Sequence, residues 1–307
     1  MYEAIVVGGG PAGLSAALPL ARSHRRVLLI DAGEGRNAPA EGVHNVLGHD
    51  GTAPEALRRA GREQLLAYPT AEVAEGEVER AEPAPDGGFR LRTADGRTLA
   101  TRRLVLATGL YDELPAVPGL AEIWGRTAVH CPYCHGYELT GERLAVLGSG
   151  PEKVRLALQL TRFTDDVVLL ADGERPAREA AELLAAHGVT VRCERVLRFE
   201  SADGRLEQIA LEGAEPLPRD AVFVASTLRQ RSPLAGQLGC TPLPTGAVEV
   251  DDFQRTSVPG VYAAGDMAHR AALPMPFAAV SVAAASGIVA GSMLDRELVG
   301  ADFKLDG

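Results

Sequence analysis

A strand, a glycine-rich turn, a helix and a second strand open the chain, and this unit limits the fold more than any other feature. The segment "AIVVGGGPAGLSAALPLARSHRRVLLIDAG" predicts a buried strand over 5–7, a helix to about residue 23 and a second buried strand over 27–30. Alternation of strand, helix and strand at this spacing is typical of a parallel α/β sheet.

Three glycines in the spacing G-x-G-x-x-G lie in the first turn: Gly8, Gly10 and Gly13. In this pattern they allow a tight turn, a close approach of backbone N–H groups to a pyrophosphate at the helix N-terminus, and close packing of helix on strand. The second strand ends in Asp31, where a carboxylate is placed to accept hydrogen bonds from a ribose. The unit therefore predicts a dinucleotide-binding domain.

A second copy of this plan lies in "RLAVLGSGPEKVRLALQLTRFTDDVVLLADG", with strands over 144–147 and 167–170 and a helix to about residue 163. The first two glycines are kept, but Lys153 occupies the third position, where close packing favours glycine or alanine. After the second strand the sequence offers Asp172 rather than an arginine for a 2′-phosphate. The fold of a dinucleotide-binding domain is predicted here, while binding of a dinucleotide stays open.

Two other segments predict strands that deliver polar groups to a cofactor. "RRLVLATGL" ends in Thr108 and Gly109, where backbone passes close to a bound group, and "TSVPGVYAAGDMAH" carries a strand over 260–264 followed by Gly265 and Asp266. A carboxylate at the last position is placed to bind the hydroxyls of a ribityl chain.

A long apolar segment near the end, "FAAVSVAAASGIVAGSML", predicts a buried helix rather than a membrane span, because it contains serine and ends in charge. Pro276 suits the first helical position, and we expect the helix over about 277–294. Its positive N-terminal end would suit a ring that becomes anionic on reduction.

The 307 residues are enough for two domains. Residues 72–101 predict a small β-meander, and the proline-rich segments at 114–120 and 242–250 predict linkers. We therefore expect an α/β protein with two Rossmann-like, three-layer domains, the second inserted in the first. The predicted boundaries are 1–115 and 246–307 for the outer domain and 116–245 for the inserted one.

The hexapeptide "HCPYCH" at 130–135 places Cys131 two residues before Cys134, a spacing used for haem attachment, for zinc and for redox disulfides. The opening residues contain no export signal, which disfavours haem attachment and favours a cytoplasmic protein. The other cysteines, Cys193 and Cys240, stand alone, whereas a closed zinc site needs four ligands. A redox pair is the favoured interpretation, and no metal site is predicted.

The formal net charge of −10 is scattered along the chain, and no basic stripe is present. A surface of this sign repels phosphate backbones, so we expect no nucleic-acid partner and, with no membrane helix predicted, no membrane partner.

In this order, GGGPAG, LATG, a C-x-x-C pair, a second G-x-G and GVYAAGD resemble the low-molecular-weight thioredoxin reductases over essentially the whole chain. The resemblance implies FAD on the split domain, a redox-active disulfide on the inserted domain, a homodimer, and rotation of one domain against the other. Asn45, in "HNVLG", matches the E-N-F-P-G segment that lies near the flavin in that family. The residues that we assign to the cofactor are Gly8, Gly10, Pro11, Ala12, Gly13, Asp31, Asn45, Thr108, Gly109, Gly265, Asp266, Phe277 and Ala278.

The sequence also departs from that family. The residue after the cysteine pair is His135 instead of aspartate, and the arginine-rich NADPH segment and the Arg-Gln pair before the last helix are absent. NAD(P)H use is therefore doubtful. "CPYCHGYE" is similar to the dithiol oxidases of the gliotoxin and holomycin pathways, which pass electrons to oxygen, while other relatives without NADPH motifs take electrons from ferredoxin.

By the family pattern, Cys134 contacts the flavin and Cys131 exchanges with the substrate. A helix start lowers the pKa of a thiol, and an imidazole such as that of His135 titrates near the working pH and can move the proton. The first hypothesis is a reductase of thioredoxin-like proteins or small disulfides with an altered or lost NADPH site. The alternatives are a dithiol oxidase using oxygen, a ferredoxin-linked reductase, and a flavin redox sensor without turnover. Roles for His130, His44 and His49 stay open.

Overall fold

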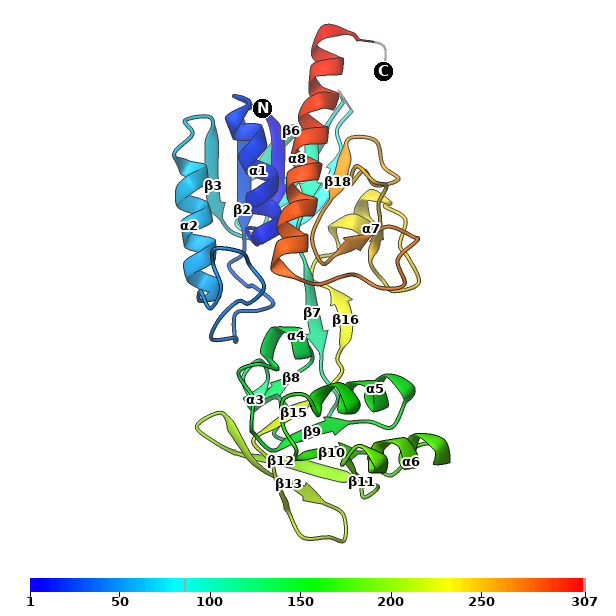
Figure 1. The fold of residues 1–307 in the computed structure, drawn as a ribbon. Helices are drawn as coiled ribbons and strands as arrows, with labels where there is room; N and C mark the ends of the chain where they lie inside the picture. The colour runs from blue at the N-terminus through cyan, green and yellow to red at the C-terminus, as the bar shows by residue number, and fades with distance from the viewer. Residues whose placement is uncertain (86, 306–307) are drawn as a thin grey trace. The chain divides into compact units, whose positions relative to one another are not determined.

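The computed structural model describes residues 1–85 and 87–305, which form two compact units (Figure 1). The first unit is made of Met1–Ala38, Thr52–Tyr111 and the chain from Leu228 onward, and the second of Pro39–Gly51 and Asp112–Thr227. Strands β7 (Leu110–Glu113) and β16 (Thr227–Gln230), which pair with each other, carry the chain from one unit to the other and back.

These boundaries differ from those expected at 115 and 246. The proline-rich segment at 242–250 is a turn within the first unit, closed by a hydrogen bond from the Gly246 N–H to the Leu243 carbonyl, 2.8 Å. The segment 39–51, which precedes the predicted insertion in sequence, belongs to the second unit.

The first unit contains a seven-stranded sheet in the order β3-β2-β1-β6-β5-β4, with β18 pairing to β6. Its strands are β1 (Tyr2–Val7), β2 (Val27–Asp31), β3 (Ala71–Glu75), β4 (Val78–Pro83), β5 (Phe89–Thr93), β6 (Thr98–Leu106) and β18 (Val261–Ala263). The strands β3, β2, β1, β6 and β18 are parallel, while β4 and β5 form the predicted antiparallel meander with β6. A parallel pair, β17 (Val248–Glu249) with β19 (Ala268–His269), and helix α7 (Leu234–Leu238) complete the strands and short helices of this unit.

Successive residues of β1 point to opposite faces of the sheet, and both faces are buried. Ala4 and Val6 pack with helices α1 (Pro11–Arg22), α2 (Pro54–Leu66) and α8 (Val280–Phe303). Ile5 and Val7 pack with residues of β4, β5 and α7 on the other side. Burial on both faces explains why β1 and β2 are continuous apolar runs. Helices α1 and α8 lie side by side over the sheet (Figure 1).

The last helix begins later and ends later than the sequence predicted. It spans Val280–Phe303, with Ala279 as an extended N-cap, so Pro276, Phe277 and Ala278 precede it. The turns of α8 beyond residue 294, where the sequence predicted its end, contact Arg25. Its guanidinium bonds Asp295 and Asp302 at 2.7 Å each. Ion pairs with Arg25, which lies in the turn before β2, and burial of Leu298 in the core shared with α1 stabilise this extension.

The second unit repeats the parallel plan. Its five-stranded sheet has the order β11-β10-β9-β15-β8, with helices α5 and α6 packed on one face and a three-stranded antiparallel sheet, β12-β13-β14, on the other. The sheet strands are β8 (Ala128–Val129), β9 (Leu144–Leu147), β10 (Val167–Leu170), β11 (Thr190–Arg192) and β15 (Ala221–Phe223). The remaining elements are α3 (Leu120–Ile123), α4 (Pro132–His135), α5 (Pro151–Leu160), α6 (Arg178–Ala186), β12 (Val196–Ala202), β13 (Arg205–Leu211) and β14 (Leu217–Pro218).

The predicted α/β class, with two Rossmann-like units and small antiparallel meanders, is confirmed. Among the described residues, none of the helices has the length and apolarity needed to span a membrane.

Candidate redox and cofactor sites

The first glycine turn closes by direct backbone contact and leaves one side open. A Cβ on Gly8 (φ +109°) would lie 2.2 Å from the Ala107 carbonyl oxygen, and one on Gly13 would lie 1.8 Å from the Gly8 carbonyl oxygen. A Cβ on Gly10, in contrast, would meet no atom of the described residues within 4 Å. The N–H groups of the first turn of α1 therefore border free space, as binding of a pyrophosphate requires.

Asp31, at the end of β2, is fixed by two donors. Its Oδ1 accepts a hydrogen bond from the Gly9 N–H, 3.0 Å, and its Oδ2 pairs with the guanidinium of Arg62 on α2. A carboxylate has about four acceptor positions, so capacity remains for the hydroxyls of a ribose. Sequence reasoning missed Arg62, although Arg58 and Arg62 lie one helical turn apart on α2.

The carboxyl ends of β1, β6 and β18 meet at this same edge, because Leu106 is in register with both Val7 and Ala263. They bring four predicted residues to the edge: Thr108, Gly109, Gly265 and Asp266. Gly265 (φ +78°) donates its N–H to Ser286 Oγ, 2.9 Å, and Asp266 pairs with Arg36 at 3.4 Å. Ligands of parallel α/β sheets bind at such an edge.

The structure places the last predicted cofactor residues on a loop. Phe277 is 71% exposed and Ala278 is half-buried, and both precede α8, so neither occupies the helical position that we expected. The N-terminal N–H groups of α8 start instead at Val280.

In the second unit, Cys131 is the N-cap of the single-turn helix α4, and Cys134 lies within it. The N–H of Cys134 and the N–H of His135 both donate to the Cys131 carbonyl, 3.2 Å each. Both cysteines are half-exposed. The spacing C-x-x-C thus brings the two residues to one turn, although a helix of four residues offers less of a dipole than the sequence suggested.

His135 is unusual among the polar side chains described. Both ring nitrogens are buried, and neither has a hydrogen-bond partner within the described residues. Burial lowers the pKa of His135 from its ordinary value; the charge of Glu138 opposes this shift and that of His44 reinforces it. The ring is therefore neutral at neutral pH and can take up a proton. Leaving a buried nitrogen unpaired costs about 1–3 kcal/mol, which the surrounding packing must offset.

Asn45 lies against the cysteine turn, within the second unit. Its side-chain Nδ2 donates to the Tyr133 carbonyl, 2.8 Å, and its backbone N–H donates to Asp50 Oδ1, 3.1 Å. Its φ of +60° is a left-handed conformation that asparagine tolerates better than most residues. His130, by contrast, stacks on Trp124 with ring centroids 6.0 Å apart, which supports a structural role for His130.

The glycine turn of the second unit carries a side chain over its first glycine, while a Cβ on Gly150, the counterpart of Gly10, would meet no described atom within 4 Å. The stem of Lys153 lies over Gly148, with Cγ 3.1 Å from where a Cβ of that glycine would be, and burial lowers the pKa of the lysine. Ser149 Oγ donates to the carboxylate of Glu174, a residue that sequence reasoning missed. Asp172 (φ +52°) accepts the Val196 N–H, 2.8 Å. Lys153, Ser149 and Asp172, which lie at or near positions that we assign to phosphate and ribose in the first unit, are thus engaged in internal contacts here.

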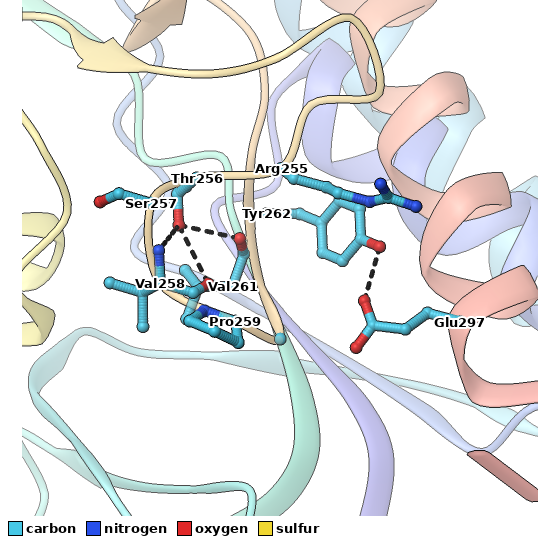
Figure 2. Close-up of a pocket in the computed structure, with 9 residues that line it drawn as sticks. Arg255, Thr256, Ser257, Val258, Pro259, Val261, Tyr262 and Glu297 are labelled. Atoms are coloured by element: carbon cyan, nitrogen blue, oxygen red, sulfur yellow. Dashed lines mark hydrogen bonds between the residues drawn. The ribbon is translucent and has the colours of Figure 1, made fainter. Parts of the chain in front are cut away.

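A separate cavity of about 310 Å³ lies in the first unit between the turn at 255–262 and Glu297 of α8 (Figure 2). Its polar groups are paired with one another: the Tyr262 hydroxyl donates to Glu297, 2.7 Å, and Thr256 Oγ1 donates to the Val261 carbonyl, 2.9 Å. None of the predicted site residues lines it. Among the described residues, no cluster of three or more His, Cys, Asp or Glu side chains could hold a metal ion.

Comparison with known proteins agrees with this arrangement. The pyridine nucleotide-disulphide oxidoreductase family matches residues 2–287. Thioredoxin reductase tcpT of Claviceps purpurea is 36% identical, over 97% of this chain and 95% of its own, and thioredoxin reductase sirT of Leptosphaeria maculans is 32% identical, over 99% and 96%. The crystal structure of HlmI is 40% identical, with a TM-score of 0.90 over 99% of this chain and 94% of that one.

Proposed function

The chain belongs to the pyridine nucleotide-disulphide oxidoreductases, in their thioredoxin-reductase-like branch, and from that premise we propose an FAD-dependent disulfide oxidoreductase that works without NADPH. Electrons would pass between the flavin, the Cys131–Cys134 pair and a disulfide or dithiol substrate. The observation that carries this proposal is the buried, unpaired imidazole of His135 directly after Cys134.

The first unit offers the groups that FAD needs. The open face of Gly10 and the N-terminal N–H groups of α1 would receive the pyrophosphate, Asp31 a ribose, and Asp266 the ribityl hydroxyls. When bound, the flavin would supply or accept two electrons at a time, which is the number that converts a dithiol into a disulfide.

The residues of the second unit account for the thiol chemistry. In the direction of dithiol oxidation, a substrate thiolate attacks the sulfur of Cys131 in the Cys131–Cys134 disulfide, and Cys134 leaves as a thiolate. The second substrate thiol then displaces Cys131, so the substrate loses two electrons and two protons and the cysteine pair gains them. Neutral His135 takes a proton from the incoming thiol and returns it to the Cys134 thiolate. Reduction of a substrate disulfide is the reverse of these steps.

Loss of NADPH use is supported by the side chains around the glycine turn of the second unit. The Lys153 stem packs against Gly148, where the first unit has the close contact of Gly13 with Gly8, and the Glu174 carboxylate follows β10, where NADP-binding domains present an arginine to the 2′-phosphate. A carboxylate there repels that phosphate.

The contacts of Lys153 and Glu174 at the nucleotide turn favour a second, more specific candidate, a dithiol oxidase that passes the electrons to oxygen. A reductase of thioredoxin-like proteins would need another donor, such as ferredoxin. A redox sensor without turnover is the remaining alternative, and steady-state oxidation of a dithiol would exclude it.

An anaerobic titration tests the proposal. The purified yellow protein is mixed with NADPH, then NADH, then dithiothreitol, and the flavin absorbance is followed. We expect no bleaching with either nicotinamide and bleaching with the dithiol. Bleaching near one equivalent of NADPH would instead establish a working nucleotide site and a reductase. Failure of every reagent to bleach the flavin would refute the dithiol chemistry.

A further inference from the structure

A loop at 43–51 is attached to the turn that carries the cysteines. The loop is closed by a hydrogen bond from the Gly51 N–H to the Val43 carbonyl, 2.8 Å, and by Asp50, which accepts the N–H of Asn45. The bond from Asn45 to the Tyr133 carbonyl joins it to α4 within the same unit. The loop therefore lies against the turn that carries the dithiol.

The His44 side chain of this loop lies between two carboxylates. Its Nδ1 lies 3.4 Å from an oxygen of Asp50, and its Nε2 lies 3.4 Å from an oxygen of Glu138. The side chain is 22% exposed, against 71% for Asp50 and 44% for Glu138. The imidazole therefore bridges two carboxylates, one from the loop and one from the cysteine turn.

Glu138 has two imidazoles within its range. It follows His135 by three residues, in the turns just beyond α4, and its charge acts on His135 by raising the pKa of that ring. The carboxylate nevertheless lies on His44, while both nitrogens of His135 lack a hydrogen-bond partner among the described residues.

We propose that His44 is a positioning residue of the dithiol site, which holds the Glu138 carboxylate on its own ring and so keeps it from pairing with His135. His135 then stays neutral and able to accept the thiol proton. The importance of this arrangement for catalysis rests on the proposed function. The contact between His44 and Glu138 does not depend on it.

The charges around His135 give the expected direction of change. Burial lowers its pKa, Glu138 raises it and His44 lowers it, while Asp50 faces His44 from the loop. Removing His44 would remove a charge that lowers the pKa of His135. It would also release the Glu138 carboxylate, which raises that pKa. Both changes act in the same direction, toward a charged His135.

The test is a pH titration of the histidine ring resonances of the full chain by NMR, with the signal of His135 assigned by its loss in His135→Asn. We expect His44→Asn to move the His135 midpoint to higher pH, Glu138→Gln to move it to lower pH, and the double variant to lose the upward shift. His49→Asn is the matched control, because His49 is exposed in the same loop, and it should leave the midpoint unchanged.

An unchanged or lower midpoint in His44→Asn would overturn the proposal. If that variant does not fold, Glu138→Gln decides alone, since a midpoint that fails to fall would show that Glu138 does not act on His135. The titration needs no turnover, so its outcome is independent of whether a dithiol bleaches the flavin.

Discussion

A Cβ on Gly287 would lie 2.1 Å from the carbonyl oxygen of Ala12, so helices α8 and α1 touch backbone to backbone at the first turn of α1. One turn further on, Gly291 has the same relationship to the carbonyl of Ala16, also 2.1 Å. Ala12 also lies against Gly265, whose Cβ would be 2.8 Å from its own. The last helix thus supports the turn that we assign to the pyrophosphate, although it contributes none of the predicted glycines.

We therefore predict that Gly287→Ala destabilises the fold and weakens FAD binding together. The added methyl has no space beside a carbonyl, and overpacking of this kind costs about 1–3 kcal/mol. Urea denaturation and the flavin content of the purified protein would measure the two effects. Gly236→Ala in α7 is the control, because its Cβ would meet no described atom within 4 Å. Equal stability of the two variants would contradict the close contact.

A second prediction concerns Arg62, which pairs with Asp31 and keeps one buried nitrogen without a partner among the described residues. Replacing it with alanine leaves the Asp31 carboxylate uncompensated at the position that we assign to the ribose of the cofactor. Loss of a hydrogen bond to a charged group costs about 1.5–3 kcal/mol, so we expect FAD affinity to fall at least about tenfold.

Equilibrium titration of the FAD-free protein with FAD would measure this change. Arg59→Ala on the same helix is the matched control, because Arg59 is exposed and its contact with Glu63 is 3.9 Å long. If both variants bind FAD like the unaltered protein, Arg62 has no part in ordering the ribose site.

A feature of this chain could be predicted from the sequence where the residues that determine it lie close together in the sequence. Both glycine turns and their flanking strands were predicted, because the turn geometry and the apolar runs are encoded within about 30 residues. The contacts of Asp31 with Arg62 and of His44 with Glu138 join segments far apart in the chain and carry no local pattern. They emerge only from packing.

The start of α8 shows a different limit. Proline is common at the first position of a helix, so Pro276 was a reasonable prediction. In the structure, Ala279 is extended, with φ −147° and ψ 145°. The helix therefore begins at Val280, three residues after the start that we expected near Phe277. Local propensity allowed both starts, so the sequence alone could not decide between them.

A third prediction separates the thiol chemistry from cofactor binding. Cys134→Ser should abolish bleaching of the flavin by a dithiol, because no disulfide can form with Cys131, while the bound flavin is retained. Cys193→Ser should leave both properties unchanged, since Cys193 lies beyond β11, outside the cysteine turn. Loss of the flavin from the Cys134 variant would undo the assignment of FAD to the first unit.

A fourth prediction follows from the pKa of His135, which burial lowers. A neutral imidazole is the form that accepts a proton, so dithiol oxidation should be fast at neutral pH and should decline only as the pH falls through the lowered pKa. Replacing His135 with asparagine removes the proton acceptor, and we expect a loss of rate of about 100-fold together with the acid-side inflection. Stopped-flow measurement of flavin reduction between pH 5 and 8 would show both.

The same group links stability to pH, and the sign can be stated. Because the pKa of His135 is lower in the folded chain, the unfolded chain binds more protons in the window between the two pKa values, and the free energy of unfolding falls as the pH drops through that window. Above the ordinary histidine pKa, near 6.5, the contribution is constant. The decrease in unfolding free energy between pH 7.5 and 5 should therefore be smaller in His135→Asn than in the unaltered protein. Identical pH dependence in both proteins would mean that His135 titrates as it does in the unfolded chain, and that its burial imposes no electrostatic cost.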